Sequence, residues 1–323
     1  MYSEKASQII TKTFTPPHPL KTVVLFLIFN RSDTTKQVFE AIRQAKPPRL
    51  YVAADGQRVD KPGEAEKCEE VRRIATQVDW DCEVKTLFRD KNLGCKYAVS
   101  GAIDWFFENE EEGIILEDDC LPSQSFFWFC EELLERYLGD ERVMQICGSN
   151  FLNGWLRNDD SYYFSQYGPV WGWASWRRAW IYYDVDMKLW PEVKEKKIFL
   201  DFCDGKSEMS YRLNLYDKVF AGEIDTWDYQ WGFAKIINHG LSVTPNANLI
   251  SNIGFREDGT HVANGNSPFA NMQALSVHFP LSHPKFVCRD RISDQRYLKN
   301  FVNRGTLNFF LCKLLSIGKR LAI

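Results

Sequence analysis

Short apolar segments alternate with helical patterns along the first half of the chain. Continuous apolar runs predict buried strands over residues 23–29, 50–54, 84–88, 113–116 and 143–147. Between these runs, apolar residues recur every three or four positions and predict helices near residues 32–45, 64–78, 96–107 and 125–137. Strands that alternate with helices favour an α/β fold of Rossmann-like type, with a mostly parallel central sheet flanked by helices.

The second half, from about residue 148, follows a less regular pattern. It contains six tryptophans between Trp155 and Trp190. Because neither an internal repeat nor a low-complexity linker separates the halves, we predict one domain over residues 21–290, in which residues 21–150 and 151–290 share a cleft. An extension (residues 1–20) precedes this domain, and a basic amphipathic tail (residues 291–323) follows it.

Composition narrows the class of protein. The chain has 323 residues, with 40 basic and 43 acidic side chains and a net charge of −3, which excludes a protein that works mainly through non-specific contact with nucleic acid. Its nine cysteines are odd in number and contain no Cys-x-x-Cys pair, so we expect neither a zinc module nor a disulfide framework. With no signal-peptide or membrane-spanning pattern, we expect a cytoplasmic protein.

Polar residues follow three of the predicted strands. They are Asn30-Arg31, Asp55-Gly56 and the acidic triplet Glu117-Asp118-Asp119. Ligands of open α/β sheets bind beyond the carboxyl ends of the strands, so these clusters indicate one site. Three crowded carboxylates repel each other unless a cation joins them, and carboxylate oxygens suit Mn²⁺ or Mg²⁺. The triplet therefore predicts a metal site, although a solvated acidic turn would have the same sequence.

The remaining polar residues of the first half suit a nucleotide. Arg31 can contact a phosphate or a base, and Asp55 can accept a hydrogen bond from a ribose hydroxyl or a base. A further polar stretch precedes the helix at residue 96, whose amide end favours an anion; it contains Arg89, Asn92, Gly94 and Lys96. The sequence has no Walker loop, no G-x-G-x-x-G after a strand and no G-x-S-x-G, which removes the main support for P-loop ATPases, dinucleotide dehydrogenases and α/β-hydrolases.

Aromatic residues surround the candidates of the second half. Trp173, Trp227 and Trp231 suit either core packing or stacking on sugar faces, and the sequence leaves both interpretations open. Asp228 lies between aromatic residues, an environment that can prepare a carboxylate as a general base, and Asp225 and Glu223 are the fallback candidates. His261, after a glycine-rich turn, is a candidate for contact with a phosphate or a metal.

Taken together, these clusters resemble a metal-dependent nucleotide-sugar glycosyltransferase of the GT-A fold, and most closely the N-acetylglucosaminyltransferase I family. Asn30-Arg31 and Asp55-Gly56 are similar to that family's N-R and D-G elements, and the segment GIILEDDCLPSQSFF at residues 113–127 resembles its E-D-D-L…P-D-F-F pattern. Elsewhere G-S-N with N-G (148–154), G-W and W-P resemble further family elements, and Trp227-Asp228 stands where the family has D-D-W. The resemblance spans about residues 23–261.

The resemblance implies a role for each element. Asp119, with His261, would bind Mn²⁺ or Mg²⁺, and Glu117 and Asp118 would contact the ribose or the donor sugar. Asp228 would deprotonate an acceptor hydroxyl, which implies inversion at the anomeric carbon. Residues 21–150 would bind the nucleotide-sugar donor, with a UDP-sugar expected, and residues 151–290 a glycan or lipid-linked acceptor. Because the chain lacks the usual membrane anchor, we expect a relative that builds surface polysaccharides.

Two other functions fit parts of the pattern. A sugar nucleotidylyltransferase also uses a nucleotide fold and a metal, but Asn30-Arg31-Ser-Asp33 is not the glycine-rich phosphate loop that such enzymes have after the first strand. A non-catalytic glycan-binding protein would explain the tryptophans but not the acidic triplet. The basic tail either touches an anionic membrane, where a lipid-linked acceptor would lie, or packs back on the domain.

Overall fold

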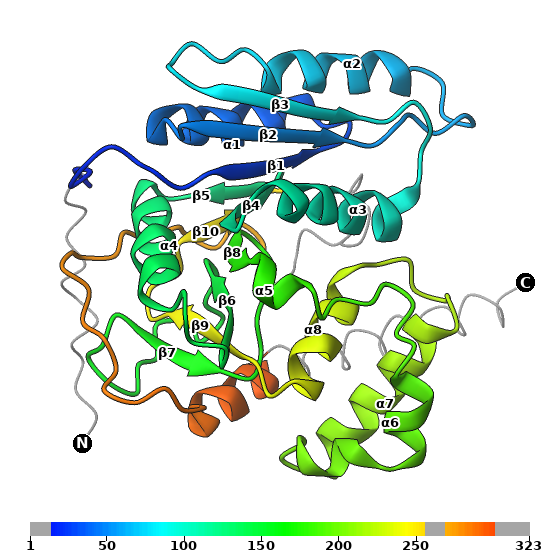
Figure 1. Cartoon of the computed structure of the whole chain (residues 1–323), viewed down its shortest axis with the longest axis vertical. Coiled ribbons are helices and arrows are strands. Elements are labelled where there is room, and N and C mark those ends of the chain that lie inside the picture. The colour runs from blue at the N-terminus through cyan, green and yellow to red at the C-terminus, as the bar shows by residue number, and fades with distance from the viewer. Residues whose placement is uncertain (1–13, 256–268, 301–323) are drawn as a thin grey trace, which may run out of the picture.

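The computed structural model describes residues 14–255 and 269–300 of the chain. In this part, eight strands form one sheet in the order β3-β2-β1-β4-β8-β6-β9-β7, which runs from top to bottom in Figure 1. The sheet strands are β1 (Val24–Ile28), β2 (Arg49–Ala54), β3 (Glu83–Phe88), β4 (Glu112–Glu117), β6 (Val143–Cys147), β7 (Tyr162–Ser165), β8 (Trp173–Trp176) and β9 (Leu241–Pro245). Two short strands, β5 (Cys120–Pro122) and β10 (Ile250–Asn252), pair antiparallel beside it.

Most of the sheet is parallel. The strand β1 pairs in parallel with both β2 and β4, and β6 pairs in parallel with β9. The strand β8 is antiparallel to both β4 and β6, so it joins the strands of the first half to those of the second. The predicted α/β fold with a mostly parallel sheet is confirmed, and the less regular second half proves to be a continuation of the same sheet.

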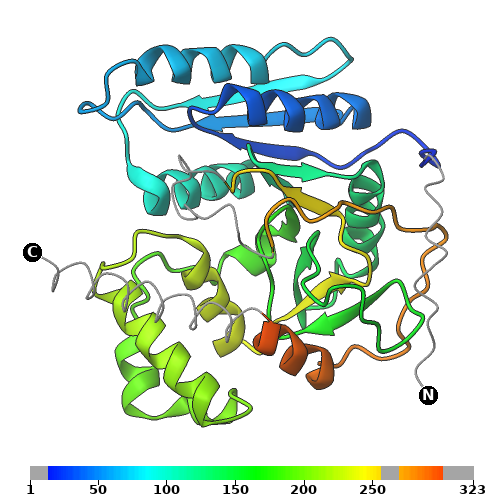
Figure 2. The ribbon, with the colours of Figure 1, turned by 180° about the vertical axis from the view of Figure 1, so that it is seen from behind.

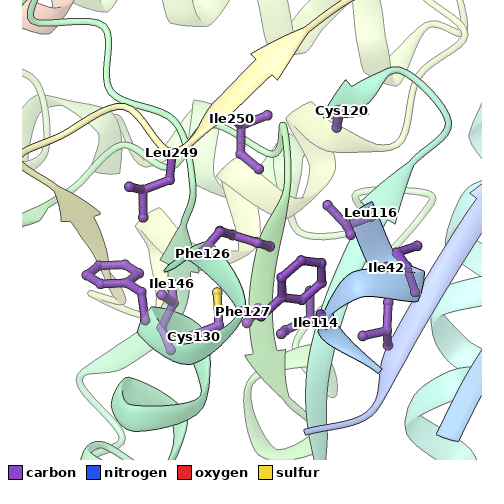
Figure 3. Packing of buried hydrophobic residues seen from close by; sticks show 14 of the residues in the cluster. Ile42, Ile114, Leu116, Cys120, Phe126, Phe127, Cys130, Ile146, Leu249 and Ile250 are labelled. Atoms are coloured by element: carbon purple, nitrogen blue, oxygen red, sulfur yellow. The ribbon is translucent and has the colours of Figure 1, made fainter. Parts of the chain in front are cut away.

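Helices cover both faces of this sheet (Figures 1 and 2). They are α1 (Ser32–Ala45), α2 (Glu64–Ala75), α3 (Gly94–Asn109), α4 (Gln124–Arg136), α5 (Arg177–Trp180), α6 (Trp190–Glu195), α7 (Lys206–Phe220) and α8 (Asp228–Ile237), with the 3₁₀ turn η2 (Ile198–Asp201). Side chains alternate along β1: Phe26 packs with α1 and α4 on one face, and Leu25 packs with α3 on the other. Figure 3 shows the first of these two cores, where Phe126 and Phe127 of α4 lie against Ile114 and Ile146 of the sheet.

A third apolar cluster joins α6, η2 and α7 to the outer side of α8. Its centre is Trp190, whose ring lies 5.4 Å from that of Tyr216 and 5.9 Å from that of Phe233. The helix α8 is therefore held between this cluster and the sheet. No helix of the described residues is apolar over the length that a bilayer crossing requires.

The described part of the tail ends in a helix over residues 291–300. Arg296, one of its basic residues, lies over the ring of Trp155 at 4.7 Å, and Tyr297 stacks on Tyr167 at 5.1 Å. These contacts bring the start of the tail onto the domain. Residues 301–323, on which the expected membrane contact mainly depends, lie outside the described residues.

Candidate functional site

A cavity of about 650 Å³ opens at the carboxyl ends of β1, β2 and β4. This volume lies within the range of small-molecule and cofactor sites. One wall belongs to the first half and contains Arg31, Asp55, Arg89 and the acidic triplet, and a second wall belongs to residues 224–229 of the second half. The parallel strands place the first wall here because their carboxyl ends meet at the same edge of the sheet.

Asp118 is the most buried member of the triplet, at 3% exposure. Its Oδ1 accepts a hydrogen bond from Arg31 Nη2 at 2.5 Å, and its Oδ2 accepts one from the backbone N–H of Phe29 at 3.2 Å. Both oxygens thus tie the end of β4 to the end of β1. Asp118 therefore holds Arg31 in position in this structure. The resemblance implies that Asp118 contacts the donor, but both of its carboxylate oxygens already accept hydrogen bonds from the protein.

Asp119 lies in the turn between β4 and β5 and faces the cavity. Its Oδ2 pairs with Arg31 Nη1 at 3.0 Å, and among the described residues its Oδ1 takes only the weak thiol contact of Cys120 at 3.5 Å. Gly254 follows β10 and lies directly against this pair: a Cβ at position 254 would come within 2.8 Å of both Arg31 Nη1 and Asp119 Cβ. The ion pair therefore requires a residue without a side chain at position 254.

Glu117 differs from its two neighbours because, among the described residues, no hydrogen bond or ion pair of its carboxylate is found. The side chain of Glu117 is half-buried. Its burial and the negative charges of Asp119 and Asp118 raise the pKa of Glu117 to about 8. Asp228, on the second wall, adds a smaller contribution of the same sign, while Arg31 acts against it. Glu117 is thus the carboxylate that gains most from a hydrogen-bond donor or a cation in the cavity.

Asp55 supports the loop that follows β3. Its carboxylate accepts the backbone N–H groups of Gly56 at 2.9 Å, Leu93 at 3.0 Å and Gly94 at 3.1 Å. These bonds hold the first turn of α3 against the end of β2. We expected Asp55 to bind a ribose or a base. This geometry does not favour that role, because backbone N–H groups already donate to both of its carboxylate oxygens.

The other predicted donor residues divide into two groups. Arg89 lines the cavity and donates a hydrogen bond to the carbonyl of Ala98 at 3.2 Å, and Asn92 lines it while its amide holds the carbonyl of Gly56 at 2.8 Å. The side chains of Asn30 and Lys96 turn elsewhere. Asn30 donates to Glu64 at 2.9 Å, and Lys96 Nζ lies 4.0 Å from Asp186, so neither forms part of the cavity wall.

Asp228 is the first residue of α8 and lines the second wall. The hydroxyl of Thr226 donates a hydrogen bond to its Oδ1. This hydrogen bond orients the carboxylate at the N-terminus of the helix, a position that favours a negative charge. The neighbouring Asp225 also lines the cavity, but it accepts the backbone N–H of Lys96 at 3.3 Å and so helps to close α3 against this wall.

The predicted sugar-stacking tryptophans are core residues. Trp173 and Trp231 are fully buried, and Trp227 is 2% exposed. Their rings pack together, with Trp173 at 5.8 Å from Trp227, and Trp231 donates to Gln145 at 2.9 Å. The assignment of Trp173 and Trp231 to an acceptor site is therefore wrong for this structure, because strand and helix bury them between sheet and α8. Trp227 lines the cavity, but only 2% of its surface is exposed.

Trp171 and Phe255 are two of the aromatic residues that do line the cavity. Their rings lie edge to face at 5.4 Å, and Phe151 supports Trp171 at 5.1 Å. The backbone explains why Trp171 and Trp173 have different surroundings: Gly172, between them, has a φ of +61°, which breaks the extended chain. The glycine between the two tryptophans was the sequence signal for this change of direction.

The charges of the cavity wall are unbalanced. Six carboxylates face three guanidinium groups: Asp55, Glu117, Asp118, Asp119, Asp225 and Asp228 against Arg31, Arg58 and Arg89. Within residues 14–255 and 269–300, no three His, Cys, Asp or Glu side chains gather into a metal cluster, and His261 lies outside the described residues. Mg²⁺ sites, however, often use one or two carboxylates together with substrate phosphates. Asp119, the more exposed of the two carboxylates that pair with Arg31, is the residue that could hold a cation of that kind.

Comparisons with known proteins do not assign the chain to a family. No protein-family model and no curated protein sequence matches it. Among solved structures, an apo UDP-glucose pyrophosphorylase is 9% identical, with 70% of this chain and 90% of that one covered and a TM-score of 0.33. A cytidylyltransferase from Leptospira borgpetersenii is 11% identical over 55% of this chain and 72% of that one, with a TM-score of 0.31. The bifunctional glycosyltransferase WbbM is 10% identical over 44% of this chain and 25% of that one, with a TM-score of 0.27.

Proposed function

We propose that this protein is a metal-dependent glycosyltransferase, which moves a sugar from a nucleotide-diphosphate donor to a hydroxyl of a glycan or of a lipid-linked acceptor. One observation carries the proposal: the acidic triplet at the end of β4 and Asp228 at the start of α8 line the same cavity of about 650 Å³. A sugar bound between them would have a leaving-group site on one side and a base on the other.

The first wall suits the diphosphate. A nucleoside diphosphate brings further negative charge to a wall in which carboxylates outnumber guanidinium groups, so it would bind together with a divalent cation, Mn²⁺ or Mg²⁺. Asp119 and the donor phosphates would hold this cation, which supplies charge neutralisation for the departing diphosphate. Glu117, whose pKa is raised by burial and by the charges of Asp119 and Asp118, would accept hydrogen bonds from hydroxyl groups of the donor.

The second wall suits the acceptor. Asp228 would take the proton of the acceptor hydroxyl as that oxygen attacks the anomeric carbon, a contribution of roughly 10²- to 10⁴-fold in rate. A donor sugar bound between Asp228 and the triplet would be attacked from the face away from the diphosphate, which inverts the configuration. Trp171 and Phe255 would offer an apolar face to a sugar ring. A UDP-sugar donor and a role in polysaccharide synthesis are part of the same proposal.

The experiment incubates the protein with a panel of nucleotide sugars, MnCl₂ and candidate saccharide acceptors, and measures free nucleoside diphosphate. A glycosyltransferase releases nucleoside diphosphate, with Asp228→Asn and Asp119→Asn as inactive controls. The cytidylyltransferase and pyrophosphorylase among the structural neighbours are named for reactions at phosphorus. In a parallel incubation with added pyrophosphate, such an activity would instead convert the sugar nucleotide and pyrophosphate into a nucleoside triphosphate and a sugar 1-phosphate. Triphosphate formation, or binding without any turnover, would contradict the proposal.

A further inference from the structure

Arg31 occupies an unusual position in the cavity wall. Among the described residues that line the cavity, it is the cation that pairs with the triplet, and it pairs with two members at once: Nη2 lies 2.5 Å from Asp118 Oδ1, and Nη1 lies 3.0 Å from Asp119 Oδ2. Of the other two cavity arginines, Arg58 pairs with Glu64, and Arg89 donates to a backbone carbonyl. Arg31 thus sits where a cation bound to Asp119 would sit.

The two contacts of Arg31 differ in how easily they can be exchanged. Asp118 has a side-chain exposure of 4% and is held a second time by the N–H of Phe29. Leaving such a buried carboxylate without its guanidinium would be costly. Asp119 has a side-chain exposure of 14% and, apart from the weak thiol contact, no second partner at its carboxylate among the described residues. The Asp118 contact is therefore the fixed one and the Asp119 contact the exchangeable one.

We propose that Arg31 holds the place of the metal ion on Asp119 in the ligand-free protein and gives it up when the metal and the nucleoside diphosphate bind together. This inference rests on the proposed function. After the exchange, Arg31 remains bound to Asp118, and its released Nη1 turns to a phosphate oxygen of the donor, so that both charges keep a partner. A fork of five N–H donors allows one guanidinium to serve a carboxylate and a phosphate at once.

The exchange couples the two ligands. The cation alone gains little, because the Arg31 nitrogen that it displaces finds no new acceptor. The diphosphate alone meets the excess of carboxylates in the wall. When both bind, the phosphate receives the displaced nitrogen and the cation offsets the carboxylates, so each ligand raises the affinity for the other by the same factor.

The test measures binding of MnCl₂ alone, by calorimetry and by the loss of the free Mn²⁺ signal in electron paramagnetic resonance, and then binding of UDP at saturating Mn²⁺. In Arg31→Gln, Mn²⁺ alone is expected to bind about tenfold more tightly, the size of one charge-assisted contact, while UDP binds more weakly. The coupling factor between Mn²⁺ and UDP therefore falls. A residue that merely supported the fold would weaken both ligands.

The matched control is Arg89→Gln, which removes the same charge from the same cavity without touching the triplet. It measures how much Mn²⁺ affinity rises from charge alone, and the Arg31→Gln effect must exceed it. Arg31→Lys keeps a cation for Asp118 but reaches only one carboxylate, so it should stay folded and also bind Mn²⁺ alone more tightly than the wild type.

The outcomes separate the two proposals. If UDP binding to the wild type depends on Mn²⁺ but Arg31→Gln binds Mn²⁺ alone no more tightly than Arg89→Gln does, the exchange is wrong and the proposed function stands. If the wild type binds Mn²⁺ alone as tightly as with UDP, the exchange is also wrong. If neither Mn²⁺ nor UDP binds, both proposals fail.

Discussion

Replacing Gly254 by alanine perturbs the site through a single methyl group. The added Cβ would lie within 2.8 Å of Arg31 Nη1 and of Asp119 Cβ, and closer still to Asp119 Oδ2. Since non-bonded heavy atoms prefer separations of about 3.5 Å, Asp119 or the end of β10 must move by about 1 Å. Overpacking of this kind costs about 1–3 kcal/mol, which lowers the unfolding midpoint of a chain of this length by about 1–5 °C.

The same shift separates Asp119 from the position in which it would meet the donor, so UDP affinity at saturating Mn²⁺ should fall by about 5- to 150-fold. Calorimetry measures that affinity, and thermal unfolding measures the midpoint. Gly139→Ala is the control: no atom lies within 4 Å of a Cβ at that position, so neither quantity should change. If Gly254→Ala bound UDP and unfolded as the wild type does, the view that the Arg31–Asp119 pair requires a residue without a side chain at position 254 would be refuted.

Four further substitutions test other parts of the structure. Asp228→Asn should keep the affinity for UDP and Mn²⁺ but lower the transfer rate by about 10²- to 10⁴-fold, measured as nucleoside diphosphate released in a single turnover; a near-wild-type rate would move the role of base to another carboxylate. Trp171→Leu should weaken a UDP-sugar relative to UDP by about three- to tenfold in calorimetry, whereas Trp173→Leu should lower the unfolding midpoint and leave that ratio unchanged. Lys235→Met should remove a pH dependence of stability, because burial lowers the pKa of Lys235 to about 8 in the folded protein. Between about pH 8 and 10.5 the unfolded chain therefore binds more protons than the folded one. The free energy of unfolding of the wild type then increases with pH, by up to about 1.4 kcal/mol per pH unit. Urea unfolding at pH 7.5 and 9.5 measures this gain, and equal gains in both proteins would contradict it.

The first half of the fold could be predicted from the sequence because its strands are short apolar runs between helices with clear periodicity. The run at residues 23–29 contains β1 (Val24–Ile28), and the run at residues 143–147 coincides with β6 (Val143–Cys147). The carboxyl ends of the strands also bring Arg31 and the triplet together as expected.

The second half could not be predicted in the same way. The strand β8 reads Trp-Ala-Ser-Trp, too short to be distinguished from a loop, and its place in the sheet depends on pairing with β4 and β6, which are distant in sequence. Burial of Trp173 follows from that pairing and not from its neighbours along the chain.

Side-chain partners were the other gap in the sequence interpretation. The residue types at Asp55 and Asn30 suit a nucleotide, yet both side chains stabilise loops: Asp55 binds the first turn of α3, and Asn30 binds Glu64. Short-range patterns reveal where a polar residue lies along a strand or loop, but not which backbone group comes near it after folding. Gly254 was missed for the same reason, since its value lies in a contact with Asp119, far away in sequence.

The strand β8 also decides how the molecule can come apart. Its antiparallel ladders to β4, from Glu112↔Trp176 to Ile115↔Trp173, and to β6 make a single hydrogen-bonded ribbon of the strands beneath both cavity walls. A fragment cut between the halves would leave the edge of β4, with Ile114 and Ile115, open to association with other chains. Separating the two halves would break both ladders of β8, so we expect the strands on either side of it to unfold together in one cooperative transition.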